Sequence, residues 1–192
     1  MSRVKKGQKF LDLGCCFGQV IRKLVHDGAP AENLVGTDLE QGFVDLGYDL
    51  FKDRGRLEST FTAGDFFGSE IVERYERSFD FVHAASFFHL FTWSEQVEVM
   101  SKAILLLRPV SGSLLFGRQT SFDQSGPFEH PATRSGEMFR HDEASFRELV
   151  SQVQAEFGTN LKVEVNVHDN SKWAPTDKDP MKWRMMYFCI TT

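Results

Sequence analysis

The sequence lacks several features that would place it in a specialised class of protein. No apolar run approaches the roughly 18 residues that a membrane-spanning helix needs, which excludes such a helix. The basic start leads into a strand pattern without a signal peptide. The three cysteines, two of them adjacent, form neither a disulfide framework nor a pattern with metal-ligand spacing. These absences predict a reduced, cytoplasmic protein that uses no metal.

A strong charge of one sign is also absent. The chain carries 22 basic and 27 acidic residues, a formal charge of −5, and the basic residues are scattered. A nucleic-acid partner is therefore not expected. The 192 residues, 41% of them hydrophobic, suit a single domain that spans residues 1–192.

What is present is an alternation of strand and helix patterns. The run at 79–84 is apolar almost throughout, as in a strand buried on both faces of a parallel sheet. The helix expected over 41–54 carries Phe43, Leu46, Leu50 and Phe51 on one stripe. The expected strands span residues 9–13, 33–38, 59–63, 79–84, 112–117, 161–167 and 184–192, and the other expected helices span 18–26, 94–107 and 143–157.

This alternation predicts an α/β fold, a three-layer sandwich around a mostly parallel sheet. Only a loop, residues 168–183, joins the last two strands, so an antiparallel strand is expected at the edge of the sheet. Ligands of such sheets bind at the carboxyl ends of the strands. The functional residues should therefore follow the strand ends.

A glycine-rich turn follows the first expected strand. In Leu11-Asp-Leu-Gly-Cys-Cys-Phe-Gly18, Gly14 permits a tight turn and Gly18 permits close packing of the helix that follows. A dinucleotide-binding fingerprint would need glycine at 16 and 19, where Cys16 and Gln19 stand, and the Gly-Lys-Ser/Thr of a phosphate-binding loop is absent. The turn is expected to bind a ligand other than a pyrophosphate.

Two aspartates end the next two strands. Asp38 stands twenty residues after Gly18 and can accept both hydroxyls of a ribose. Asp65 can accept the exocyclic amine of adenine, with Phe66 or Phe67 packed on the ring. Each aspartate alone fits the cap of a following helix equally well. A glycine turn and two acids on three successive strands together favour a nucleoside site.

At this point the chain resembles the class I S-adenosylmethionine-dependent methyltransferases. The turn is similar to their first motif, Asp-x-Gly-x-Gly-x-Gly, with Cys16 in place of the middle glycine. The resemblance implies a Rossmann-like, seven-stranded, mostly parallel sheet with an antiparallel last strand, and S-adenosylmethionine as cofactor, released as S-adenosylhomocysteine. It implies that Asp12 orients the methionine part through its amino group. The cofactor-binding set is expected to comprise Asp12, Gly14, Cys15, Cys16, Gly18, Asp38, Leu39, Gly64, Asp65, Phe66 and Ala84.

A narrower resemblance is to fungal secondary-metabolite methyltransferases, which share a similar Leu-Asp-Leu-Gly-Cys-Cys-Phe-Gly-Gln stretch. It implies transfer of a methyl group to an oxygen of an apolar small molecule, either a carboxylate or a hydroxyl. For a carboxylate, Arg118 is a candidate clamp; for a hydroxyl, His89 is a candidate general base. An ordinary surface ion pair and a packed helix-face histidine are the alternative interpretations of these two residues.

Other reactive side chains carry weaker signals. His83 fits a buried core group inside a strand, and Cys15 and Cys16 fit small loop residues better than nucleophiles. His130 and His141 flank residues 119–140, a long loop expected to cap the substrate.

Only eight residues precede the first expected strand, whereas the family usually has several dozen that form a lid. The chain is therefore expected to lack this lid, and a partner or a homo-oligomer is expected to cover its place. A protein that binds the cofactor but serves as a scaffold, a regulatory partner, or a cyclase or isomerase is the alternative function. A dehydrogenase is disfavoured by the missing glycines.

Overall fold

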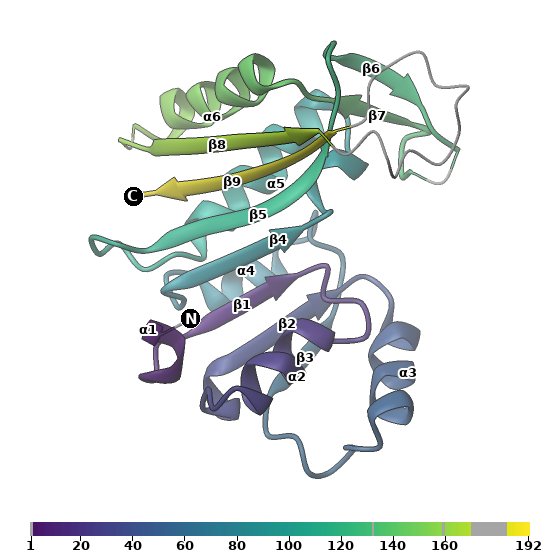
Figure 1. Cartoon of the computed structure of the whole chain (residues 1–192), viewed down its shortest axis with the longest axis vertical. Coiled ribbons are helices and arrows are strands. Elements are labelled where there is room, and N and C mark those ends of the chain that lie inside the picture. The colour runs from purple at the N-terminus through teal and green to yellow at the C-terminus, as the bar shows by residue number, and fades with distance from the viewer. Residues whose placement is uncertain (1, 132, 159, 170–183) are drawn as a thin grey trace. The chain divides into compact units, whose positions relative to one another are not determined.

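A computed structural model describes residues 2–131, 133–158, 160–169 and 184–192 (Figure 1). Its strands are β1 (Phe10–Leu13), β2 (Leu34–Asp38), β3 (Thr60–Ala63), β4 (Phe81–Ala85), β5 (Leu114–Ser121), β6 (Gly126–Glu129), β7 (Glu137–Arg140), β8 (Lys162–Asp169) and β9 (Arg184–Thr191). Its α-helices are α1 (Ser2–Lys5), α2 (Gln19–His26), α3 (Gln41–Phe51), α4 (Glu70–Tyr75), α5 (Trp93–Leu105) and α6 (Glu143–Phe157), and the 3-10 helices are η1 (Ala31–Asn33) and η2 (Phe88–Leu90).

The expected α/β class and mostly parallel sheet are confirmed. Seven strands form one sheet in the order β3-β2-β1-β4-β5-β9-β8, and the last strand, β9, runs antiparallel to β8. The edge strand, β8, pairs antiparallel with β9, but the last strand is not the outermost one, because β9 lies between β5 and β8. The connection from β8 to β9, residues 170–183, lies outside the described residues.

The chain divides into two compact units, which are described separately. Unit 1 comprises Met1–Ala84 and Leu105–Leu115, and unit 2 comprises Ala85–Ile104 and Phe116–Thr192. In unit 1, β1 pairs in parallel with β2 and β4, and β2 pairs with β3. All four residues of β1 are buried, so this strand is the centre of the unit 1 core. The carboxyl ends of β1 to β4 therefore meet at one edge of this unit.

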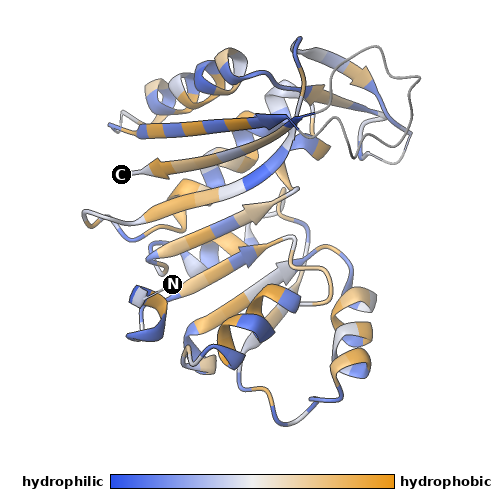
Figure 2. Ribbon diagram, viewed as in Figure 1, coloured by the Kyte–Doolittle hydropathy of each residue, from blue (hydrophilic) through white to orange (hydrophobic). Residues whose placement is uncertain are grey.

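The apolar stripe of helix α3 is largely exposed. Phe43, Leu46, Leu50 and Phe51 are 41–66% exposed, whereas Val44 and Gly47 are buried. Gly47 is required because a Cβ there would collide with the carbonyl oxygen of Phe17. Close backbone packing at Gly47 therefore attaches this helix, together with ring contacts of Phe43 and Tyr48. The apolar character of α3 in Figure 2 thus belongs largely to its solvent-facing side.

Unit 2 is built on a hairpin of two eight-residue strands, β8 and β9. Figure 2 shows β8 alternating between hydrophilic and hydrophobic residues, as expected for a strand with one covered face. On the same face of the hairpin, Phe188 of β9 is paired with Val165 of β8. The ring of Phe188 contacts those of Phe88 on η2 and Phe146 on α6. Ser145 and Asp142 form a capping box at the start of α6.

The stretch expected as a long loop, residues 119–140, contains regular structure. Strand β5 continues to Ser121, and β6 and β7 form an antiparallel hairpin. Glycine and proline at the start of β6 concealed this hairpin, because both are unusual in strands. The short helix α4, only six residues long, was also missed because it is too short to show a helical period.

A buried histidine connects several elements of unit 2. The Nδ1 atom of His141 lies 3.0 Å from the Ser145 hydroxyl, and its Nε2 atom lies 3.0 Å from Oε1 of Gln96. The Gln96 amide nitrogen donates to the carbonyl oxygens of Phe91 and Phe139. Since this leaves Oε1 as an acceptor, Nε2 of His141 must carry its proton. Burial lowers the pKa of His141 to about 4, so the ring is neutral at pH 7.

This burial predicts an acid-sensitive fold. The folded pKa of His141 is about 4 against an ordinary 6.5, so between these pH values the unfolded chain binds a proton that the folded chain does not. Stability is therefore retained above pH 6.5 and falls as the pH decreases toward 4. At about pH 5, His141 alone should lower the free energy of unfolding by about 2 kcal/mol relative to neutral pH, as measured by urea unfolding.

His26 provides the matched control because it is exposed at the end of α2. The variant His26→Gln should keep the wild-type pH dependence, whereas His141→Gln should reduce it. Equal pH dependence in His141→Gln and wild type would contradict the assignment.

Candidate functional site

The turn between β1 and α2 contains three residues in the left-handed backbone region. Gly14 and Gly18 both have φ of 66°, and Cys16 has φ of 51°. These are the three glycine positions of the Asp-x-Gly-x-Gly-x-Gly pattern. The chain therefore keeps the backbone path of that motif although its middle glycine is replaced. A Cβ at Gly18 would also collide with the ring of Phe61, so glycine is needed there for space as well.

Asp38, at the end of β2, stabilises this turn. Its Oδ2 atom accepts a hydrogen bond of 2.7 Å from the backbone N–H of Cys16, and Oδ1 accepts one of 3.1 Å from the N–H of Glu40. A carboxylate oxygen has two lone pairs, so Asp38 keeps acceptor capacity for ribose hydroxyls. The left-handed conformation of Cys16 costs about 1–2 kcal/mol, which this charge-assisted bond offsets.

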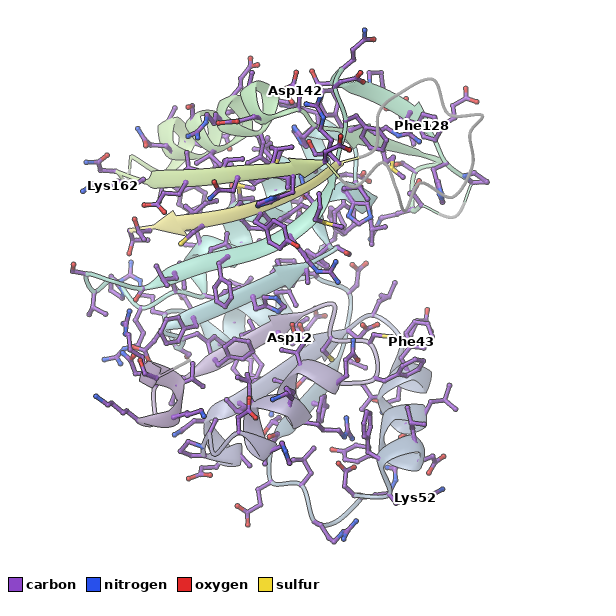
Figure 3. The ribbon with its side chains drawn as sticks, viewed as in Figure 1. Asp12, Phe43, Lys52, Phe128, Asp142 and Lys162 are labelled. Carbon is purple, nitrogen blue, oxygen red and sulfur yellow. The ribbon has the colours of Figure 1, made fainter. Side chains whose placement is uncertain are left out.

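Asp12 and Cys15 lie buried beneath the turn. Asp12 is 3% exposed, and its Oδ1 atom lies 2.7 Å from Nδ1 of His83 on β4. Burial raises the pKa of the Asp12 carboxyl, and the neighbouring charge of Asp38 raises it further, whereas His83 lowers it. Burial also raises the pKa of the Cys15 thiol well above its usual range, which argues against a nucleophilic thiolate. Figure 3 labels Asp12 at its place on β1.

The remaining candidates of unit 1 lie at the next strand ends. The N–H of Gly64 donates to the carbonyl oxygen of Asp38, and Asp65 accepts the N–H of Phe67 in a turn. The strand ends that carry Asp38 and Asp65 are thus adjacent. Phe66 is 7% exposed and Leu39 is 63% exposed. Ala84, on β4, is fully buried.

Arg22 on α2 stabilises the turn by binding the carbonyl oxygen of Phe17, a role that was not predicted from the sequence. Its guanidinium forms two hydrogen bonds to Asp53, of 2.7 and 2.9 Å, and one of 2.6 Å to the carbonyl oxygen of Phe17. The same group lies over the rings of Tyr48, Phe51 and Phe61. No sequence signal marked this arginine, because its partners are up to 39 residues away.

The residues of unit 1 fit S-adenosylmethionine by their chemistry. The cofactor carries an ammonium group, two ribose hydroxyls and an adenine amine, all of which donate hydrogen bonds. Carboxylates are acceptors, and one is supplied by Asp12 on β1, one by Asp38 at the end of β2 and one by Asp65 in the turn after β3. Among the described residues no cluster of three or more His, Cys, Asp or Glu could hold a metal ion.

The two candidate catalytic residues, His89 and Arg118, both belong to unit 2. Burial, followed by the nearby His130, lowers the pKa of His89 to about 4, so this imidazole is neutral but weakly basic at pH 7. Its Nδ1 atom is buried without a hydrogen-bond partner among the described residues. Arg118 is exposed on β5, and its carbonyl oxygen accepts the N–H of Ser86.

Two further polar residues of unit 2 were not predicted to belong to a site. Gln119 is fully buried, yet neither its amide nitrogen nor its oxygen has a partner within the described ranges. Nδ1 of His130 is also buried and lacks a partner there. Unpaired buried polar atoms cost about 1–3 kcal/mol each, so such atoms indicate a place where a ligand or water binds. Only burial identifies Gln119, and burial is invisible in the sequence.

The arrangement of strands places the chain among Rossmann-like methyltransferase folds. Phosphoethanolamine N-methyltransferase 2 of Haemonchus contortus, solved with S-adenosyl-L-methionine, matches with a TM-score of 0.68 at 12% identity, over 97% of this chain and 49% of that one. The cyclase SpnF matches with a TM-score of 0.66 at 15% identity, over 97% of this chain and 75% of that one. At such identities these structures show the fold alone.

The family follows from the sequence comparison. Residues 10–110 match the model of a methyltransferase domain, and the chain belongs to this family, whose cofactor is S-adenosylmethionine. It is 43% identical over 176 residues to O-methyltransferase phiE of a fungus designated Fungal sp., covering 90% of this chain and 58% of phiE. It is 37% identical to the Asnovolin E/Chermesin D methyltransferase nvfJ of Aspergillus novofumigatus, covering 85% of this chain and 59% of nvfJ.

The chain thus spans about three fifths of the length of these curated relatives. The resemblance to fungal secondary-metabolite methyltransferases is confirmed, and the scaffold or cyclase alternative is not favoured. The cyclase neighbour shares only the fold, whereas the relatives that are 37% and 43% identical over the aligned residues are named methyltransferases. Within the described residues no helix is both long and apolar enough to span a membrane.

Removal of the Asp38 carboxylate tests its expected ribose contact. Asp38→Ala should weaken binding of S-adenosylhomocysteine by about 1–3 kcal/mol in calorimetric titration, because the ribose hydroxyls lose an acceptor. Asp38→Asn keeps an oxygen for the Cys16 N–H and should lose less. Asp45→Ala, which removes an exposed carboxylate of α3, is the control. Unchanged affinity in Asp38→Ala would refute the contact.

The left-handed residue at position 16 gives a second prediction. Cys16→Gly should keep the wild-type free energy of unfolding within about 1 kcal/mol, because relief of backbone strain offsets the entropy that glycine gains in the unfolded chain. Cys16→Val should lose about 1–2 kcal/mol, since a β-branched residue tolerates positive φ poorly. Thermal or urea unfolding measures both. Equal stability of the two variants would show that the turn relaxes to negative φ.

Proposed function

We propose that this chain contains the catalytic domain of an S-adenosylmethionine-dependent O-methyltransferase that acts on a carboxylate of an apolar small molecule of fungal secondary metabolism. The observation that carries the proposal is the 43% identity to a named O-methyltransferase over 90% of the chain. The carboxylates at the ends of β1, β2 and β3 support a cofactor site in unit 1.

The residues of unit 1 have distinct proposed roles. When bound, S-adenosylmethionine supplies an electrophilic methyl group on a sulfonium. Asp38 accepts hydrogen bonds from the ribose, Asp65 accepts one from the adenine amine, and Asp12 faces the amino group of the methionine part. The turn at Gly14, Cys16 and Gly18 keeps the backbone close to the ligand, since its left-handed residues bend the chain tightly.

The polar residues of unit 2 are proposed to serve the acceptor. His89, Gln119 and His130 have buried polar atoms without partners among the described residues, and Arg118 supplies an exposed positive charge on β5. A methyl acceptor that carries oxygen atoms on an apolar skeleton matches such polar groups in a phenylalanine-rich unit.

The pKa of His89 favours a carboxylate as the nucleophile. An efficient general base has a pKa near the working pH, whereas the pKa of His89 is about 4. A phenol or alcohol would need a stronger base. A carboxylate is already ionised at neutral pH and needs only orientation, which a guanidinium provides. Arg118 is therefore proposed as the clamp and His89 as a neutral hydrogen-bond partner.

This choice predicts the chemistry of the product. With S-adenosylmethionine labelled on its methyl group, and an alkylated benzoic acid and the matching phenol as acceptors, label should enter a methyl ester that mild base hydrolyses. Arg118→Gln should raise KM for the acid by roughly 10–100-fold, because a charge-assisted hydrogen bond is lost. The phenol should show no such change.

Arg118→Lys, which keeps the charge, and His89→Gln serve as comparison variants. Label found only in a base-stable methyl ether would refute the carboxylate. Equal effects of Arg118→Gln on both acceptors would refute the clamp.

A further inference from the structure

Asp12 and His83 form a buried polar pair at the carboxyl end of unit 1. They are directly opposite each other in the parallel pairing of β1 with β4, so their side chains share one face of the sheet. Asp12 Oδ1 lies 2.7 Å from His83 Nδ1, and the two side chains are 4% and 16% exposed. The ring of Phe10 stacks on the imidazole at 6.0 Å. The pair is therefore fixed in orientation from two sides.

Such a pair is an unusual way to stabilise a sheet. Phe10 and Phe81, two residues before Asp12 and His83 on the same face of the sheet, are buried and apolar, and apolar residues at 12 and 83 would continue this core. Desolvation of charged groups commonly offsets their attraction, so a buried ion pair contributes little net stability. A role in ligand binding explains the pair better than packing does.

The electrostatics show what the carboxyl of Asp12 would do without the imidazole. Burial and the charge of Asp38 both raise the pKa of Asp12, and the hydrogen bond and charge of His83 oppose them. The Cys15 thiol lies close by, and its own raised pKa keeps it neutral. Without His83, the carboxyl would be easier to protonate and free to rotate. A protonated or misdirected carboxyl is a poor acceptor for an ammonium group.

We propose that His83 is a positioning residue that holds the Asp12 carboxyl directed at the amino group of the cofactor's methionine part. This inference rests on the proposed role of Asp12 in cofactor binding. His83 acts through Asp12 and is not proposed to touch the reacting atoms. Its effect should therefore appear only with ligands that carry the amino group.

Two ligands separate this role from a merely structural one. S-adenosylhomocysteine carries the amino acid part, whereas 5′-methylthioadenosine has the same nucleoside without it. In calorimetric titration, His83→Leu should weaken S-adenosylhomocysteine by at least about tenfold, which equals about 1.4 kcal/mol. Binding of 5′-methylthioadenosine should stay within about twofold of wild type, because the adenine and ribose contacts do not involve His83.

The conservative variant and a double mutant complete the test. His83→Asn places an amide donor near the position of Nδ1 and should recover most of the affinity. In an Asp12→Asn background, His83→Leu should cause no further loss, since two residues that act as one unit are not additive. If His83→Leu fails to fold, as judged by circular dichroism, the affinities for the two ligands are compared between His83→Asn and Asp12→Asn instead.

The outcomes distinguish this inference from the proposed function. Equal loss of both ligands in His83→Leu, or no loss of either, would overturn the positioning role and leave the cofactor site intact. Failure of the wild-type chain to bind S-adenosylhomocysteine at all would overturn both the proposed cofactor site and this inference.

Discussion

The turn after β1 is the constraint on which the rest of unit 1 depends. Within five residues the chain must leave a buried strand, reverse and start α2, and it does so with left-handed residues at 14, 16 and 18. Glycine removes the steric cost at two of these positions, and the bond from the Cys16 N–H to Asp38 offsets it at the third. Behind the turn, Arg22 holds the carbonyl of Phe17, and Gly47 allows α3 to approach the same carbonyl. The hydrogen bonds from Asp38 to the Cys16 N–H and from Arg22 to the Phe17 carbonyl thus fix one backbone path for the turn.

The same interactions link fold to chemistry. Asp38 serves the turn with one lone pair of each oxygen and keeps the others for a ligand. Asp12 lies deeper, where burial alone would favour its neutral form, and His83 counters that tendency. In unit 2, burial keeps His89 and His141 neutral, but His141 is fully hydrogen-bonded whereas His89 has an unpaired nitrogen among the described residues. The pKa values of both histidines are thus lowered, but His141 is bonded within the fold whereas His89 has a nitrogen to which a ligand could bind.

The strands of unit 1, and the side chains that lie near their carboxyl ends, were largely predictable because their signals are local. A buried strand, a glycine turn and an aspartate at a strand end lie within a few residues, and parallel strands bring their carboxyl ends to one edge. The errors arose where a local pattern had two meanings. The stripe of Phe43, Leu46 and Leu50 predicted the helix α3 correctly but did not show which of its faces is buried: the stripe is exposed, whereas Val44 and Gly47 are buried. The β6–β7 hairpin was missed because glycine and proline are unusual in strands. Its pairing also joins residues about ten positions apart, which no local pattern shows.

The fold class and the family can be read from the amino-acid sequence, because motif spacing and hydrophobic periodicity are encoded along the chain. The same spacing predicts Asp12, Asp38 and Asp65 as the carboxylates of a cofactor site, which stays a prediction. Only the tertiary structure decided the pairing of His83 with Asp12, the support of the turn by Arg22, and the burial of Gln119 without a partner among the described residues. These depend on which side chains meet across elements far apart in sequence and on how much water reaches them. A histidine in a strand is the same letter whether it fills a core or orients a carboxylate, and only its neighbours in space distinguish the two.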